Sequence, residues 1–166
     1  MQIHNNKKPL VSIVVTPKNG EKLISDTITS IIENGYQNIE IVCVDDGCKD
    51  KTLSIIKNFN DDRIKIYTGE NKGYVQAMNL GKSLSKGKYL VNCDQDDLIY
   101  QGRIEKQVYF LEENSYYGAI CGSLGFIDQA GKVISEVDNN IVAVDLTNEL
   151  ITGRNSKHHS SYMIRE

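Results

Sequence analysis

Three carboxylates, Asp94, Asp96 and Asp97, stand within four residues directly after the apolar run that contains Leu90 and Val91. Because like charges this close disfavour joint ionisation, the cluster repels itself unless a cation compensates it. Mg²⁺ and Mn²⁺ bind carboxylate oxygens while keeping positions for substrate phosphates. The Asp-x-Asp pattern therefore favours a metal-bridged diphosphate, with a solvated turn or a helix N-cap as the alternative.

A second acidic pair follows another apolar, β-branched run. Residues 39–44 predict a strand that leads into Asp45, Asp46 and Gly47, where glycine permits a turn. In an open parallel sheet, ligands bind at the carboxyl ends of the strands, so we expect the two acidic clusters to face one site. An Asx-turn or a helix cap is the alternative for Asp45 and Asp46, and it is compatible with ligand binding.

Apolar runs and helical repeats alternate along the chain and predict the elements that must position these carboxylates. Runs of β-branched residues indicate strands, whereas apolar residues at i, i+3 and i+4 indicate helices. Their alternation predicts an α/β fold, with a mostly parallel sheet, helices on both faces and a small C-terminal hairpin region. We predict strands at 10–15, 39–46, 63–67, 88–93 and 118–124, helices at 21–33, 51–58, 74–85, 103–113 and 145–151, and a hairpin at 126–134.

Length and charge limit the classes of protein and partner. The 166 residues suffice for one domain with a buried core, and the net charge is −3 at pH 7. The lysines are scattered rather than gathered into a basic stripe, so we expect no nucleic-acid partner. No apolar run reaches the ~20 residues of a membrane span, and residues 1–8 lack the apolar core of a signal peptide. We therefore expect a cytoplasmic location.

The four cysteines show no Cys-x-x-Cys spacing, and three of them stand in apolar, strand-like runs. We expect them to be reduced and mostly buried. A zinc site that uses His158 or His159 is disfavoured, because no residues have the spacing of zinc ligands. The cysteines are Cys43, Cys48, Cys93 and Cys121.

Five short motifs occur together in one order. With them the sequence resembles the family 2 glycosyltransferases of GT-A fold, inverting enzymes that move a sugar from a nucleotide-sugar donor. The resemblance covers nearly the whole chain, and the order and spacing of the motifs make it specific. The motifs are Thr16-Pro17-Lys18-Asn19, Val44-Asp45-Asp46-Gly47-Cys48, Asn71-Lys72-Gly73, Ala77-Met78-Asn79-Leu80-Gly81 and Asp94-Gln95-Asp96-Asp97.

The resemblance implies roles that the chemistry of the residues supports. By this resemblance Asp46 would accept a hydrogen bond from the base, as from the N3–H of uracil, and a carboxylate suits this role because it is an acceptor only. Asp96 would coordinate Mn²⁺ or Mg²⁺ on the diphosphate, Asp94 would face the ribose or the metal, and Asp97 would either orient a ligand or cap the next helix. The implied donor-binding residues are Thr16, Pro17, Lys18, Asn19, Asp45, Asp46, Asn71, Gly73, Asn79 and Asp94, and the implied metal ligands are Asp94 and Asp96.

Two departures from the family pattern bear on binding and catalysis. Met78 stands where members often carry an arginine, which leaves the metal, Lys72 or Lys18 to balance the diphosphate charge. Members also continue to a Glu-Asp pair that supplies the general base, so we expect the catalytic base after Glu166. Such a base is worth ~10²–10⁴-fold in rate. The nearest internal substitutes are Asp128, Asp138 and Glu166, none of which stands at the family's base position.

These expectations divide the chain into a tail at 1–9, a nucleotide-sugar-binding core at 10–123 and an incomplete acceptor-side region at 124–166. The expected partners are a nucleotide-diphosphate sugar, preferably a UDP-sugar, and a glycan or lipid-linked acceptor. A lipid-linked acceptor implies a peripheral location at the inner face of the membrane, and uncovered apolar surface on the acceptor side favours a homodimer. A binding module without turnover is the alternative. A nucleotidyltransferase is a more remote alternative. Such an enzyme needs a glycine-rich basic loop after the first strand, and Lys18-Asn19-Gly20 supplies only one lysine and one glycine there.

Overall fold

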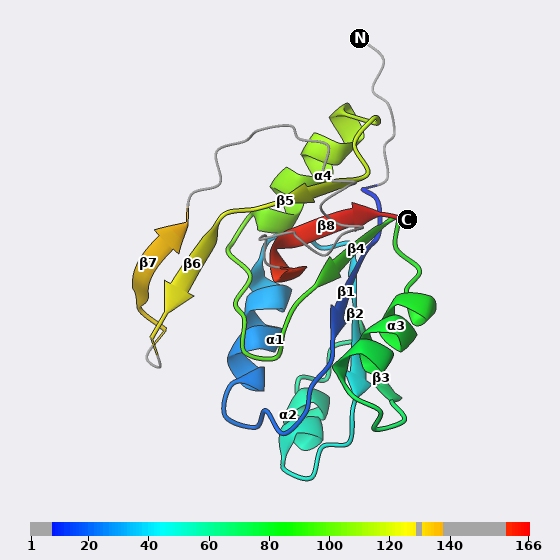
Figure 1. The fold of residues 1–166 in the computed structure, drawn as a ribbon, viewed down its shortest axis with the longest axis vertical. Helices are drawn as coiled ribbons and strands as arrows, with labels where there is room; N and C mark the ends of the chain where they lie inside the picture. The colour runs from blue at the N-terminus through cyan, green and yellow to red at the C-terminus, as the bar shows by residue number, and fades with distance from the viewer. Residues whose placement is uncertain (1–7, 129–130, 138–158) are drawn as a thin grey trace.

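The protein is described by a computed structural model that places residues 8–128, 131–137 and 159–166. Strands and helices alternate up to residue 113, as predicted, and four further strands follow (Figure 1). The elements are β1 (Val11–Val15), α1 (Ile24–Glu33), β2 (Ile39–Asp45), α2 (Thr52–Asn58), β3 (Ile64–Thr68), α3 (Tyr74–Leu84), β4 (Tyr89–Asn92), α4 (Arg103–Glu113), β5 (Ala119–Cys121), β6 (Leu124–Ile127), β7 (Val133–Val137), the short 3₁₀ helix η1 (His159–Ser161) and β8 (Tyr162–Arg165).

The central sheet has the strand order β3-β2-β1-β4-β8-β5. Its first four strands are parallel, and β1 lies between β2 and β4, so that Val11 is opposite both Ile39 and Tyr89. β8 is antiparallel to both of its neighbours. The sheet is therefore mostly parallel, as the alternating pattern predicts.

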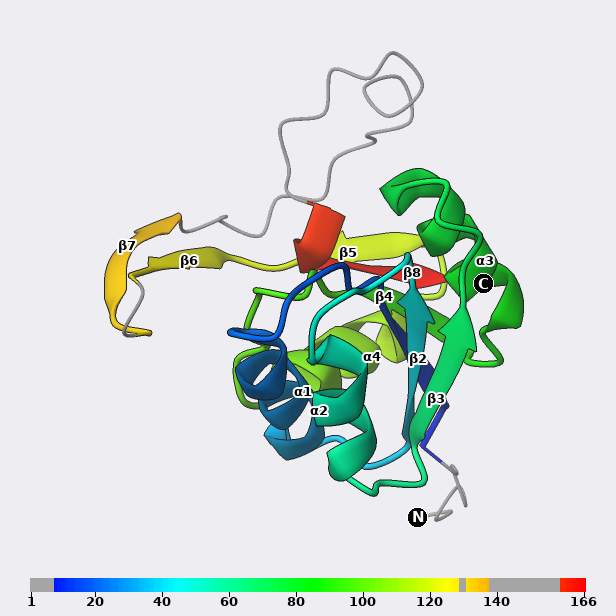
Figure 2. The ribbon, with the colours of Figure 1, turned by 90° about the horizontal axis from the view of Figure 1, so that it is seen from below.

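Helices cover both faces of the parallel strands (Figure 2). Val11, Ile13 and Val15 of β1 belong to a large apolar cluster that includes buried residues of α1, α2 and α4. Val14, on the opposite face of the same strand, belongs to a smaller cluster with Ala77 of α3. Burial on both faces explains why these strands consist of continuous apolar runs rather than alternating ones.

The predicted helix at 21–33 begins later, at Ile24. The carbonyl oxygen of Gly20 accepts hydrogen bonds from the amides of Leu23 and Ile24, both at 3.0 Å, so a turn precedes the helix. Asn34 ends the helix and Gly35 follows with φ of 100°. The Asn-Gly stop signal in the sequence is thus confirmed.

The C-terminal third of the chain departs from the sequence prediction. The single strand predicted at 118–124 is wrong, because β5 ends at Cys121 and Leu124 begins β6. The predicted hairpin exists as β6 and β7, with a register shift between Phe126 and Ile127. β8 was not predicted, and it pairs within the central sheet although its residues lie in the segment assigned to the acceptor side. The helix predicted at 145–151 lies outside the described residues.

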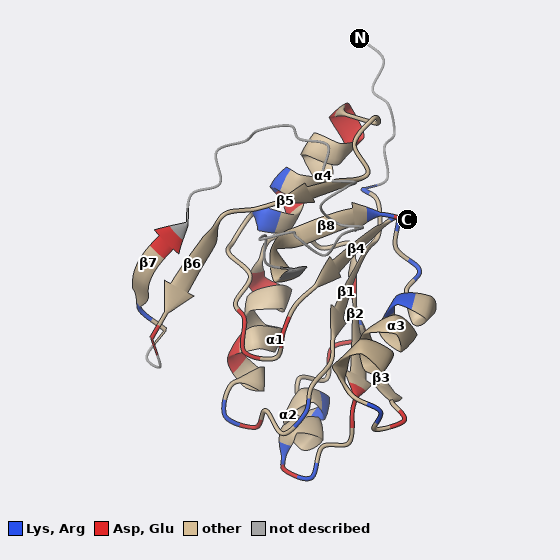
Figure 3. Cartoon of the chain, in the orientation of Figure 1, with Lys and Arg blue, Asp and Glu red and all other residues tan. Residues whose placement is uncertain are grey.

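Charged residues of both signs are interspersed along the described part of the chain (Figure 3). Among the placed residues, no helix has the length and apolar character needed to cross a bilayer.

Candidate functional site

The two acidic clusters meet at the carboxyl ends of β1, β2 and β4. Because β1 pairs in parallel with both neighbours, the loops that follow these three strands emerge at one edge of the sheet. They enclose a cavity of about 380 Å³, called the small cavity below. Its lining residues are Thr16, Lys18, Asp46, Tyr74, Asp94, Gln95 and Asp96.

Asp46 is the buried acceptor of this cavity, with only 4% of its side chain exposed. Its Oδ1 accepts a hydrogen bond from the amide of Gly73 at 3.1 Å. Its Oδ2 accepts one from Nζ of Lys18, also at 3.1 Å, and Nζ donates as well to Oδ1 of Asn71 at 3.1 Å. Both carboxylate oxygens therefore have donors, which offsets the cost of burying the charge. Lys18, which is nearly half exposed, is the partner that a ligand can displace.

Asp45 has a different role from its neighbour. Its Oδ1 accepts hydrogen bonds from the amides of Gly47, at 3.1 Å, and Cys48, at 2.8 Å, which is an Asx-turn. It does not line the small cavity, and it does not cap α2, whose N-cap is Lys51. Asp45 therefore fixes the turn that holds Asp46 in place.

Asp94 and Asp96 line the cavity from the loop after β4. The hydroxyl of Tyr74 donates a hydrogen bond to Oδ1 of Asp94 at 3.2 Å. Burial, and then the charge of Asp94, raise the pKa of Tyr74, so its phenol stays protonated and remains a donor. Asp94 is half-buried, whereas Asp96 is exposed to solvent.

These two carboxylates fit a hard divalent cation by their chemistry. The described residues contain no group of three or more His, Cys, Asp or Glu that would hold a metal ion alone. A Mg²⁺ or Mn²⁺ ion at Asp94 and Asp96 would therefore take further oxygen ligands from water and a substrate diphosphate, as Mg²⁺ commonly does. Asp97 does not cap the following helix, because α4 begins at Arg103 with Gly102 as its N-cap.

Of the other predicted donor-binding residues, Thr16 lines the small cavity, four shape its loops without lining it, and Asn79 does neither. The carbonyl oxygen of Pro17 accepts the amide of Asp46 at 3.2 Å, and Oδ1 of Asn19 accepts the amide of Lys49 at 2.8 Å. Asn71 holds Lys18, and Gly73 donates to Asp46 from a φ of 95° that favours glycine. Asn79 is exposed on α3 and does not line the small cavity.

The structure places Met78, Lys72 and Lys18 in different surroundings. Met78 packs against the apolar cluster beneath α3, and Lys72 forms an exposed ion pair with Glu70. Lys18 alone of the two lysines lines the small cavity. Sequence reasoning missed two lining residues, Tyr74 and Gln95, although both stand inside or beside recognised motifs.

The cysteines are free thiols, as expected, and two of the four, Cys43 and Cys93, are buried. Cys48 is half-buried, and its Sγ donates to the carbonyl oxygen of Pro17 at 3.4 Å, which ties the two loops together. Burial, and then its hydrogen bond with Asp45, raise the pKa of Cys48 to about 11. The thiol is therefore neutral at physiological pH and serves as a packing group.

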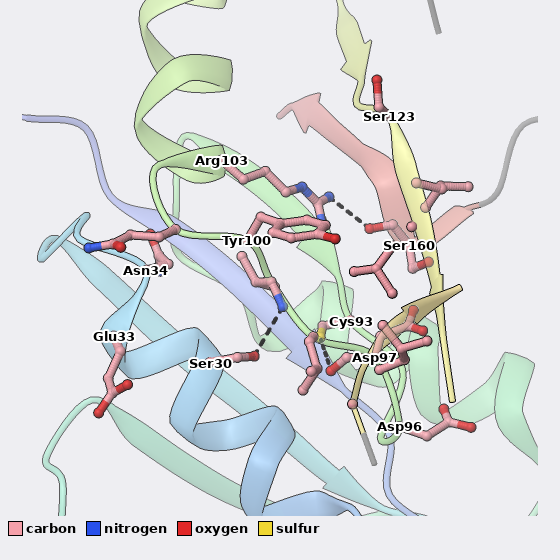
Figure 4. Close-up of a pocket in the computed structure, with 18 residues that line it drawn as sticks. Ser30, Glu33, Asn34, Cys93, Asp96, Asp97, Tyr100, Arg103, Ser123 and Ser160 are labelled. Atoms are coloured by element: carbon pink, nitrogen blue, oxygen red, sulfur yellow. Dashed lines mark hydrogen bonds between the residues drawn. The ribbon is translucent and has the colours of Figure 1, made fainter. Parts of the chain in front are cut away.

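A second cavity of about 640 Å³, the large cavity, lies on the other side of Asp96, which lines both. Figure 4 shows Tyr100 and Arg103 inside it and Asp96 at its margin. Nη2 of Arg103 donates to the carbonyl oxygen of Ser160 at 2.7 Å, and burial lowers the pKa of its guanidinium. Leu124, Gly125, Ile127 and Val133 line the cavity from the β6–β7 hairpin.

Comparison with known proteins gives this geometry a family. The model of glycosyl transferase family 2 matches residues 12–155. An uncharacterized glycosyltransferase of Haemophilus influenzae is 38% identical over 122 residues, which cover 72% of this chain and 38% of that protein.

Two solved structures share the fold. S. aureus TarS 1–349 in complex with UDP-GlcNAc has a TM-score of 0.74 at 19% identity, over 93% of this chain and 45% of that one. The mannosyltransferase PcManGT of Pyrobaculum calidifontis, in complex with GDP-Man and Mn²⁺, has a TM-score of 0.63 at 23% identity, over 69% of this chain and 35% of that one. The chain thus spans less than half the length of each of these three proteins. Because the family model matches most of its residues, the chain belongs to glycosyl transferase family 2.

Proposed function

We propose that the small cavity binds a nucleotide-diphosphate sugar, with a UDP-sugar as the preferred donor, for transfer of the sugar to a glycan or lipid-linked acceptor with inversion. The convergence of Asp46, Asp94 and Asp96 in one cavity is the observation that carries this proposal. Asp46 offers a buried acceptor for the base, and the loop after β4 offers the carboxylates at the phosphate end. Structures of the same fold bind UDP-GlcNAc and GDP-Man, which supports a nucleotide-sugar ligand.

In this proposal Lys18 changes partners when the donor binds. The imide N–H of uracil takes over Oδ2 of Asp46, and the released ammonium is free to neutralise phosphate charge. Asp94 and Asp96 would hold a Mn²⁺ or Mg²⁺ ion, which would supply Lewis-acid stabilisation of the leaving nucleoside diphosphate. The Mn²⁺ in the PcManGT complex supports this choice of ion.

We assign the acceptor to the large cavity, because Asp96 is the wall that the two cavities share. Inverting transfer needs a base on the acceptor side, aligned with the attacking hydroxyl. Glu166 does not fit this role: it pairs with Lys82 at 3.4 Å, and its amide donates to Lys88 at the opposite end of β4. Asp128 lies in the β6–β7 turn, where its Oδ1 accepts the amide of Lys132, and Asp138 lies outside the described residues. A base after Glu166 stays our prediction.

The positions of Glu166 and Asp128 favour a second candidate, a module that binds the nucleotide sugar without turnover. The family match gives no support to a nucleotidyltransferase. Release of UDP or GDP from a panel of nucleotide sugars, with and without simple acceptors, separates the two candidates. Turnover near the ~10 s⁻¹ typical of enzymes would show that a base is present within these residues.

Isothermal titration with UDP tests the binding proposal. We expect binding in Mn²⁺ that is at least tenfold tighter than in EDTA, since Asp94 and Asp96 would hold the cation beside the diphosphate. GDP is the comparison nucleotide, because guanine also presents an imide N–H but on a larger ring system. Its Kd relative to that of UDP reports the preference for the base. Equal UDP affinity in Mn²⁺ and in EDTA would contradict the metal role of Asp94 and Asp96.

A further inference from the structure

Gln95 stands between the two carboxylates of the Asp94–Asp96 pair, and its side chain reaches back to the first loop. The amide of Lys18 donates to Oε1 of Gln95 at 2.8 Å, and Nε2 of Gln95 donates to the carbonyl oxygen of Lys18 at 3.3 Å. A backbone amide only donates and a carbonyl only accepts, so this pair of bonds fixes the orientation of the carboxamide. The side chain of Gln95 is thus hydrogen-bonded to both the amide and the carbonyl group of Lys18.

The backbone of Gln95 is anchored as well. Its carbonyl oxygen accepts a hydrogen bond at 2.8 Å from the hydroxyl of Thr27, a buried residue of α1. A Cβ at Gly20 would overlap the carboxamide of Gln95, so the first loop packs directly against this side chain. Gly20 is therefore the residue type that lets the loop approach Gln95.

The contacts continue from Lys18 to the buried acceptor. Nζ of Lys18 donates to Asp46, and Asp46 accepts the amide of Gly73 at the start of α3. Lys18 thus contacts both ends of the small cavity: its backbone bonds to Gln95, and the ammonium of its side chain bonds to Asp46. The two hydrogen bonds of Gln95 tie the first loop to the loop after β4, and they do not depend on the Lys18–Asp46 bond that the donor replaces in the proposed function.

We propose that Gln95 is a positioning residue that couples the carboxylates at the phosphate end to the loop at the base end. A cation at Asp94 and Asp96 then strengthens nucleotide binding through the protein as well as through the shared diphosphate. This inference rests on the proposed donor site. It assigns a role to the middle residue of the acidic motif, which would otherwise be a spacer.

The test replaces Gln95 by methionine, which keeps the length and approximate volume of the side chain and removes both hydrogen bonds. Gln76→Met, at an exposed position of α3, is the matched control. Without any ligand, we expect hydrogen exchange of the Lys18 amide to become roughly fivefold to tenfold faster in Gln95→Met, since one hydrogen bond is lost. The control should match the wild type. An unchanged exchange rate would show that Gln95 does not restrain the backbone of Lys18.

The second measurement is the ratio of the UDP Kd in EDTA to that in Mn²⁺. We expect Gln95→Met to lower this ratio about fivefold relative to the wild type, at the lower end of ordinary coupling between two sites. Faster exchange with an unchanged ratio would overturn the coupling while the donor site stands. A wild-type ratio of one would overturn the metal site and the coupling together. Gln95→Asn, which is too short to span both bonds, replaces Gln95→Met if that variant does not fold, and the same outcomes apply.

Discussion

The two halves of the central sheet are built differently. The parallel half, β3, β2, β1 and β4 with α1, α2 and α3, is covered on both faces, and every residue of β1 is buried. We group β8 and β5 of this sheet with the separate two-stranded sheet of β6 and β7 as the antiparallel half, in which the hairpin is the more open part. Phe126 and Ile134 of the hairpin are 44% and 66% exposed. Packing thus fixes the strands that end in carboxylates and leaves the strands beyond Asp96 more accessible.

This contrast separates two tasks. A buried parallel sheet holds the loops of the small cavity in fixed register, so the carboxylates keep their separation without a bound ligand. The antiparallel half supplies one wall of the large cavity through the hairpin. We expect substitutions in the parallel half to change binding or global stability strongly, and those in the antiparallel half to act more locally.

The largest expected effect is on binding, from Asp96→Asn. We expect UDP affinity in Mn²⁺ to fall about 100-fold, because losing a direct ligand should cost at least as much as the ~10–100-fold typical of losing a hydrogen-bond partner of a ligand. The melting temperature without metal should stay equal or rise, because one charge leaves a repelling cluster. Isothermal titration and thermal melts measure the two quantities. Asp62→Asn, an exposed aspartate after α2, is the control that should change neither. A large fall in the melting temperature would favour a structural role for Asp96.

The second effect concerns packing in the parallel half. A Cβ at Gly81 of α3 would overlap Val14 and lie 3.3 Å from Val44, so Gly81→Ala should lower the free energy of unfolding by about 2 kcal/mol. Gly118→Ala is the matched change beside β5, where nothing lies within 4 Å, and it should cost less than about 0.5 kcal/mol. Urea denaturation compares the two variants. Equal losses of unfolding free energy in the two variants would contradict the tighter packing of the parallel half.

The third effect concerns the attachment of β8. Arg165 donates to the hydroxyl of Tyr89 at 3.0 Å, to the carbonyl oxygen of Tyr117 at 3.4 Å and to that of Leu111. Arg165→Met should lower the free energy of unfolding by about 1–2 kcal/mol, because these acceptors lose a shared donor. UDP affinity should not change, since the contacts lie away from the carboxyl ends. Arg165→Lys tests whether the branched guanidinium is needed. A lysine ammonium is a single point charge, so this variant should recover only part of the lost unfolding free energy.

The smallest effect is a pH dependence of stability at Glu112, which contacts Tyr89 near Arg165. Lys88, and then Tyr89, lower the pKa of Glu112 through hydrogen bonds. The stability that Glu112 contributes is therefore present above its ordinary pKa of 4.5 and is lost as pH falls through the lowered value. Since a third of the side chain is exposed, we expect Glu112→Gln to cost at most about 0.5–1 kcal/mol at pH 7 and to match the wild type at pH 2. Melts across this range measure the difference, and a difference that grows towards low pH would reverse the sign.

The parallel half was predictable because its signals are local. Each strand is a continuous apolar run, each helix repeats its apolar residues at helical spacing, and the parallel arrangement alone places the loops after β1, β2 and β4 together. Asp46, Asp94 and Asp96 were identified for that reason. Contacts between loops carry no such periodicity. The hydrogen bonds from Tyr74 to Asp94 and from Gln95 to Lys18 depend on side-chain reach across the cavity.

β8 escaped prediction for a related reason. Tyr162–Arg165 is a run of four residues with one charge and no turn signal on either side, so nothing local distinguishes it from a loop. Its strand character comes from partners far away in sequence, β4 and β5. The break between β5 and β6 follows from the same cause, since only Ala119–Cys121 has a partner in β8.

The position of β8 sets an order of events for a chain that is synthesised from its N-terminus. The parallel half can form once α3 and β4 have been made. At that stage one edge of β4 is still unpaired, because its partner strand β8, in which Met163 lies opposite Val91, has not yet been synthesised. β5 pairs with the same strand, so the second half of the sheet assembles only after residues 162–165 have been made. Pairings this distant in sequence form slowly, and an open edge is available to other chains in the meantime. The newly made protein is therefore most exposed to misassembly after the small cavity has formed and before the central sheet is complete.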